Sequence, residues 1–73
     1  MTVKSVISKN VTEIEIDILR LIKEGSVSEE MLFSHRIFYY LLGYYEDEIV
    51  LYKDLMIAVI YVQDFIINEC KHW

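Results

Sequence analysis

The chain has 73 residues, a formal net charge of −5 and an apolar fraction of 55%. Nucleic-acid backbones and anionic membranes attract clustered Lys and Arg, so this acidic balance argues against both as general partners. A domain of this length rarely gains more than about 3 to 5 kcal/mol from its core, and the single cysteine, Cys70, excludes an internal disulfide. We therefore expect one domain over residues 1–73 that associates with a second copy or with another protein.

The apolar runs are too short for a membrane protein. The longest unbroken run, residues 55–62, falls well below the roughly 20 residues that cross a bilayer. Residues 1–10 contain no apolar run of the length a secretory signal needs. A lone cysteine is also typical of a reducing compartment. These observations predict a cytoplasmic protein without a membrane span.

A first helix is expected over residues 11–24. Asn10 and Glu13 have the spacing of a capping box, in which each side chain accepts a hydrogen bond from the other residue's backbone. Gly25 suits the left-handed conformation that ends many helices. The apolar period also continues backwards, which leaves open a start as early as Thr2.

A strand is the competing interpretation of the same segment. Residues 13–18 alternate between acids and isoleucines, which is a strand pattern. However, Leu21 and Ile22 restore the helical period, and an isolated two-stranded hairpin is only marginally stable. We therefore predict a helix.

Residues 27–70 carry one apolar stripe with alternating steps of four and three residues. Residues at this spacing share one face of an α-helix, because 3.6 residues make a turn. Two members, His35 and Gln63, are polar, and buried polar residues at such positions can fix the register of an oligomer. The stripe consists of Met31, His35, Phe38, Leu42, Tyr45, Ile49, Tyr52, Met56, Val59, Gln63, Ile66 and Cys70.

Ser26 and Ser28 are capping candidates for a second helix that should continue at least to Leu42. Gly43 costs a helix about 1 kcal/mol relative to Ala, and Asp47 could cap a third helix after a break. Such a break gives a C-terminal helical hairpin, so we predict an all-α fold, a small three-helix bundle. The alternative is a short first helix followed by one helix of about 40 residues, which would bury its stripe in a dimeric, coiled-coil-like assembly.

Tyrosines and acids are concentrated in one segment. Five of the six tyrosines lie within residues 39–52, among three consecutive acids. Tyrosine is enriched at interface hot spots, and an acidic surface attracts basic partners. A purely structural interpretation places Tyr45 and Tyr52 in the core and the acids in a solvated turn. The candidate partner-binding residues lie outside the stripe: Tyr40, Tyr44, Glu46, Asp47 and Glu48.

Catalytic and metal-binding patterns are weak. Glu69 and His72 have the Glu-x-x-His spacing of di-iron bundles, but such a site needs two of these pairs and two further carboxylates. The chain has no nucleophile elbow and no phosphate loop. Residues 18–31 have the layout that opens a helix-turn-helix motif, but a basic recognition helix does not follow. We expect no enzymatic activity, no metal and no cofactor.

These features favour a non-catalytic protein-protein interaction module that binds a basic partner protein, such as an inhibitor, an immunity protein, an antitoxin or a regulator. One alternative is a structural protein that forms a homodimer through the stripe, with the acids serving solubility alone. A third is a helix-turn-helix-like regulator that binds DNA, which the net charge disfavours.

Overall fold

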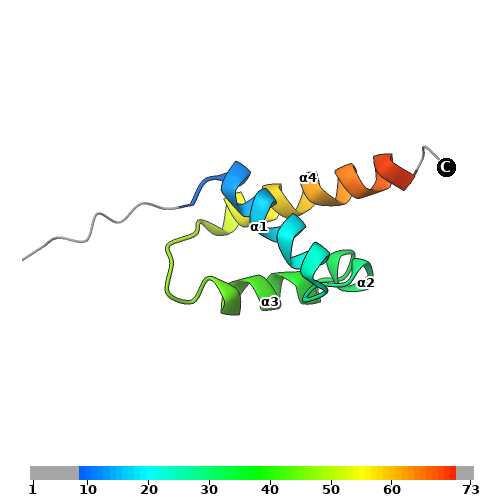
Figure 1. Ribbon diagram of the computed structural model, residues 1–73. Helices are drawn as coiled ribbons and strands as arrows, with labels where there is room; N and C mark the ends of the chain where they lie inside the picture. The colour runs from blue at the N-terminus through cyan, green and yellow to red at the C-terminus, as the bar shows by residue number, and fades with distance from the viewer. Residues whose placement is uncertain (1–8, 71–73) are drawn as a thin grey trace, which may run out of the picture.

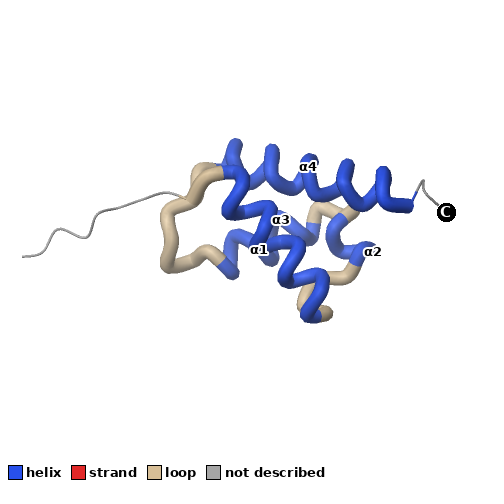
Figure 2. The backbone as a smooth tube through the Cα atoms, turned by 45° about the horizontal axis from the view of Figure 1, so that its top comes forward, coloured by secondary structure: helices blue, strands red, loops and turns tan. Residues whose placement is uncertain are grey.

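The computed structural model describes residues 9–70, which form four helices and no strand. The all-α prediction is confirmed. α3 and α4 run in opposite directions, and α1 crosses between them and packs mainly against α4 (Figures 1 and 2). No helix of the described part is long and apolar enough to span a bilayer. The helices are α1 (Val11–Glu24), α2 (Glu29–Leu32), α3 (Arg36–Tyr44) and α4 (Tyr52–Cys70).

α1 begins and ends as its capping residues predict. The Asn10 side chain accepts a hydrogen bond from the Glu13 amide at 2.9 Å, and the Glu13 carboxylate accepts one from the Asn10 amide at 3.1 Å. Gly25 ends the helix in the left-handed region, with a φ of 85°. The alternative start at Thr2 lies outside the described residues.

The isoleucines of α1 show why the strand interpretation fails. Ile14 and Ile18, four residues apart, are both fully buried, whereas Ile16 between them is 59% exposed. In a strand, all three side chains would lie on one face.

Ser34 interrupts the helix that was expected to run from Ser28 to Leu42. Ser28 caps α2 as predicted, since its hydroxyl accepts from the Met31 amide at 3.1 Å. The Ser34 hydroxyl then donates to the Met31 carbonyl at 2.9 Å and accepts from the Arg36 amide at 3.2 Å. These local bonds compete with continued helical pairing, so α2 ends and α3 begins around this residue. The result is four helices instead of three.

The second interruption lies later than Gly43. α3 continues through Gly43 to Tyr44, and residues 45–51 form the connection to α4. The single long helix is therefore wrong. Asp47 does not cap α4, which begins five residues later at Tyr52. α3 ends at its C-cap, Tyr45, whose side chain continues the buried face of Ile37 and Leu41 and bonds to Asp17 of α1.

The core does not follow the predicted stripe. Two breaks change the helical phase, so His35, Leu42 and Tyr52 are exposed although the stripe placed them on the buried face. Gln63 is half-buried and donates a hydrogen bond to the Leu32 carbonyl at 2.8 Å, which ties α4 to the end of α2. The core consists of Ile14, Ile18, Leu21, Val27, Leu32, Ile37, Leu41, Tyr45, Leu55, Ala58, Val59 and Val62.

Candidate functional site

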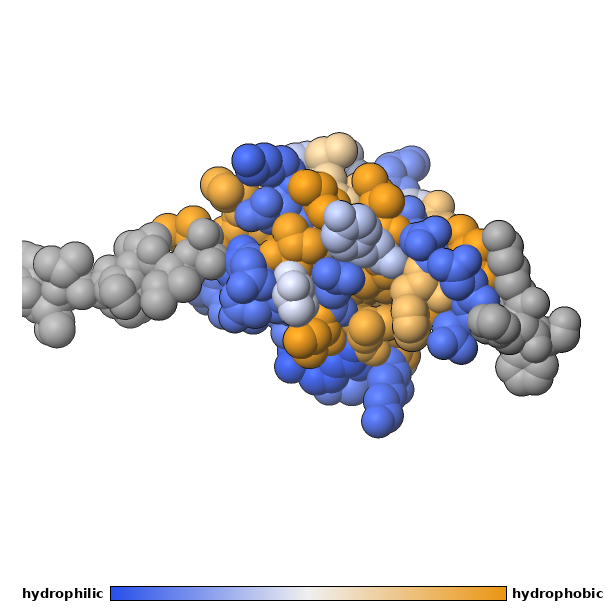
Figure 3. Space-filling model, turned by 90° about the horizontal axis from the view of Figure 1, so that it is seen from above, coloured by the Kyte–Doolittle hydropathy of each residue, from blue (hydrophilic) through white to orange (hydrophobic). Residues whose placement is uncertain are grey.

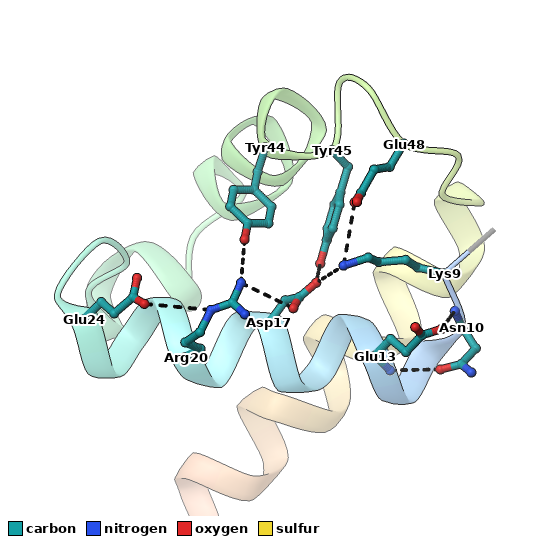
Figure 4. A network of polar contacts seen from close by, with 9 residues as sticks. All are labelled: Lys9, Asn10, Glu13, Asp17, Arg20, Glu24, Tyr44, Tyr45 and Glu48. Atoms are coloured by element: carbon teal, nitrogen blue, oxygen red, sulfur yellow. Dashed lines mark hydrogen bonds and ion pairs between the residues drawn. The ribbon is translucent and has the colours of Figure 1, made fainter. Parts of the chain in front are cut away.

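A buried carboxylate, Asp17, lies where α1 faces the end of α3. The residue is 6% exposed. Its Oδ2 accepts hydrogen bonds from Lys9 Nζ at 2.7 Å and from Tyr45 Oη at 2.6 Å, while Arg20 Nη2 lies 3.4 Å from Oδ1 (Figure 4). A buried charge is costly unless neighbouring groups compensate it. Here two cations and a hydroxyl compensate the carboxylate.

The pKa values of the groups in this cluster are all shifted further from neutral pH. Burial raises the pKa of Asp17, but the hydrogen bonds from Lys9 and Tyr45 and the nearby positive charges outweigh burial, so the pKa lies below its ordinary value. The hydrogen bond to Asp17 raises the pKa of Lys9. Burial, followed by the hydrogen bond to Asp17, raises the pKa of Tyr45. The charges are therefore fixed at neutral pH, which suits a cluster that holds structure in place.

Tyr44 and Tyr40 extend this contact along α1. The Tyr44 hydroxyl accepts a hydrogen bond from Arg20 Nη2 at 2.6 Å, and its ring stacks on Tyr40 with centroids 6.4 Å apart. The Tyr44 ring also meets Tyr45 edge-on, at 5.0 Å between centroids. In Figure 4 the hydroxyls of Tyr44 and Tyr45 both point toward α1. The two candidate tyrosines therefore help to attach α3 to α1.

The three consecutive acids lie on the connection between α3 and α4. Glu46, Asp47 and Glu48 are all exposed. Glu48 Oε2 is 3.7 Å from Lys9 Nζ, and the Lys9 amide donates to the Ile49 carbonyl at 3.2 Å. The connection is thus held against the segment that precedes α1, through both side-chain and backbone contacts.

A hollow of about 330 Å³ lies beside this connection. Glu46 and Glu48 are the charged residues that line it, and the other lining residues are apolar or aromatic. Leu42, one of these, is 53% exposed. The hollow thus combines an apolar surface with two carboxylates. Its lining residues are Leu41, Leu42, Tyr45, Glu46, Glu48, Val50 and Leu55.

The structure divides the predicted site residues between two places. Glu46 and Glu48 line the hollow, and Asp47 is on the same connection outside the hollow lining. Tyr44 instead bonds to Arg20, and Tyr40 stacks on Tyr44. Sequence reasoning did not identify the apolar part of the hollow. Leu42 had been assigned to the buried stripe but is 53% exposed, whereas Tyr45 is buried as the structural interpretation predicted and also lines the hollow.

Known proteins provide no guide to this site. No protein-family model, curated protein or solved structure matches the chain. Within residues 9–70, no group of three His, Cys, Asp or Glu residues is placed to hold a metal ion. Of the Glu-x-x-His pair, His72 lies outside the described residues.

Proposed function

We propose that the protein is a non-catalytic interaction module that binds a basic partner protein at the hollow beside residues 45–51. The observation that carries this proposal is the pairing of an apolar lining with Glu46 and Glu48. Lys and Arg have long apolar stems and charged ends, so one such side chain can contact both kinds of surface. An inhibitor, immunity protein, antitoxin or regulator of a basic protein would use a surface of this kind.

Rigidity of the connection supports the proposal. Tyr45 is buried at one end of the segment and the Ile49 carbonyl is hydrogen-bonded near the other end. A binding loop held in place before the partner arrives loses less conformational entropy on binding. The connection also exposes Ile49 and Leu51, each 49% accessible, beside the acids. Exposed apolar side chains bordered by charges are typical of protein-binding surfaces.

A random peptide library displayed on phage tests this site without knowledge of the partner. The wild-type protein should select peptides with Lys or Arg next to aliphatic residues. Binding of a selected synthetic peptide should weaken about tenfold in Glu46→Gln, because a carboxylate that contacts a bound cation is worth roughly 1 to 2 kcal/mol. Leu42→Asn should weaken binding as well, since it removes apolar surface from the hollow.

Asp47→Asn is the matched control for charge. It removes one negative charge from the same connection at a residue that does not line the hollow. It should lower affinity only through long-range attraction, which salt screens. Equal losses of peptide affinity in Glu46→Gln and Asp47→Asn would mean that the acids act only through long-range attraction and not through a site at the hollow. Selection of acidic or uncharged peptides would refute the proposal.

A further inference from the structure

α4 is apolar on more of its circumference than its contacts with the other helices use. Its buried face consists of Leu55, Ala58, Val59 and Val62. The rest of its circumference still carries large apolar and aromatic side chains, each between 36% and 54% exposed. They are Met56, Ile57, Ile60, Tyr61, Phe65 and Ile67. A helix that is hydrophobic all round is normally covered on all sides.

In Figure 3, α4 lies toward the viewer, and orange side chains are interspersed with blue ones on this surface. A side chain of this size presents about 200 Å² when fully exposed, so the six residues offer roughly 600 Å². A standard interface buries about 800 Å² per partner. The apolar area, with the stems of neighbouring charged residues, is therefore close to what a stable dimer needs.

The charged residues on the outer face of α4 favour a second copy of the chain as the partner that covers it. Lys53, Ile57, Ile60 and Asp64 follow one another at steps of four, three and four, so they share one line on the outer face of α4. Lys53 and Asp64 are both exposed, and Asp64 accepts a hydrogen bond from Asn68 at 3.2 Å. The cation and the acid thus stand at opposite ends of an isoleucine pair, about 16 Å apart along the helix.

We propose that two copies of this chain pair through the outer faces of their α4 helices, in antiparallel orientation. A two-fold axis that crosses the helix between residues 58 and 59 places Lys53 of each copy opposite Asp64 of the other. The same axis gathers Ile57 and Ile60 of both copies at the centre. A parallel pair would instead bring the two Lys53 residues together, and likewise the two Asp64 residues. The face is therefore complementary to itself in one orientation only.

Charge reversal tests this arrangement by sedimentation velocity over a range of roughly 5 to 500 µM. The wild-type chain should be a dimer. Lys53→Glu and Asp64→Lys should each raise the dissociation constant by about 10- to 100-fold, because each turns two attractive contacts into repulsive ones. An equimolar mixture of the two variants should dimerise again. In the mixed dimer, the two acids of the first variant face the two lysines of the second, so both contacts are attractive.

Neither variant is expected to unfold α4. An acid in the first turn of α4 suits the helix dipole, and Lys is a good helix former at the exposed interior position 64. Recovery of the dimer in the mixture would itself show that both variants fold. Lys23→Glu, an exposed position on α1, is the matched control for the change in net charge and should leave the dimer intact.

Three results would overturn the proposal. The first is a wild-type monomer throughout the concentration range, which would leave the face to another protein. The second is a wild-type dimer that neither reversal weakens, which would indicate a parallel pair or another surface. The third is two monomeric variants that fail to associate when mixed. These outcomes are independent of the hollow beside residues 45–51, because peptide binding is measured separately.

Discussion

Replacement of Asp17 should destabilise the fold more than any other change of a charged residue among those described. Asp17→Ala removes the acceptor of the buried Tyr45 hydroxyl and the counter-charge of Lys9. A buried polar group left without a partner costs about 1 to 3 kcal/mol, and a hydrogen bond to a charged group contributes about 1.5 to 3 kcal/mol. We expect a loss of about 3 kcal/mol in the free energy of unfolding.

This loss is large for so small a domain. Native stability of about 0.05 to 0.15 kcal/mol per residue corresponds to roughly 4 to 11 kcal/mol here. A loss of 3 kcal/mol should lower Tm by more than 10 °C, since about 4 to 8 °C accompanies each kcal/mol at this size. Asp17→Asn retains an oxygen that can accept from Tyr45 and loses only the charge. It should therefore cost about half as much.

Denaturant unfolding of a double-mutant cycle provides the measurement. The cycle contains the wild type, Asp17→Ala, Tyr45→Phe and the double variant, all at one protein concentration, since association would shift apparent stability. Tyr45→Phe keeps the buried ring and removes only the hydroxyl. The coupling free energy between the two sites should be about 1 to 2 kcal/mol. A cost below about 0.5 kcal/mol for Asp17→Ala, or strict additivity, would refute the structural role of this carboxylate.

Acid stability, the two glycines and the stoichiometry of peptide binding each give a further test. The pKa of Asp17 is lowered in the native state, so its contribution to stability is complete above about pH 4 and is lost as pH falls through the lowered value. Acid titration of unfolding should therefore show a smaller decline for Asp17→Asn than for the wild type. Gly25→Ala should cost about 1 kcal/mol because Gly25 has a φ of 85°, whereas Gly43→Ala, inside α3 with open space around it, should stabilise by about 0.5 to 1 kcal/mol, both measured by denaturant unfolding. Sedimentation of the complex with a library-selected peptide should give the mass of a 2:2 complex for the wild type and of a 1:1 complex for Lys53→Glu, while calorimetry should give one peptide per chain and equal intrinsic affinity for both.

Local signals made α1 and the capping of α2 predictable from the sequence. Asn10, Glu13, Gly25 and Ser28 act through bonds to neighbours within a few residues, so their spacing alone specifies the geometry. Ser34 is equally local, but its role depends on whether its hydroxyl bonds to the backbone instead of facing solvent. That choice is not encoded in residue spacing.

The candidate site was harder to predict because its shape depends on contacts distant in sequence. Tyr45, the C-cap of α3, bonds to Asp17, 28 residues earlier, and no periodic pattern records that bond. The three acids were visible in the sequence as a cluster, but which of them line the hollow, Glu46 and Glu48, depends on how residues 45–51 are folded. The predicted break after Gly43 gave a hairpin, but the stripe was continued in phase across that break, and Leu42 and Tyr52 were therefore assigned to the wrong face.

The buried cluster around Asp17, the hollow beside residues 45–51 and the outer face of α4 have separate roles in this small chain. The bond between Asp17 and Tyr45 holds the start of residues 45–51 against α1, beside the hollow. The α4 face begins directly after that connection, at Lys53. In an antiparallel pair, the two connections would therefore lie at opposite ends of the joined helices, about 20 Å apart along the axis. Dimerisation would then complete the cover of α4 while leaving both hollows open. A chain too short to bury all of its apolar surface could in this way gain stability and present two equivalent binding sites.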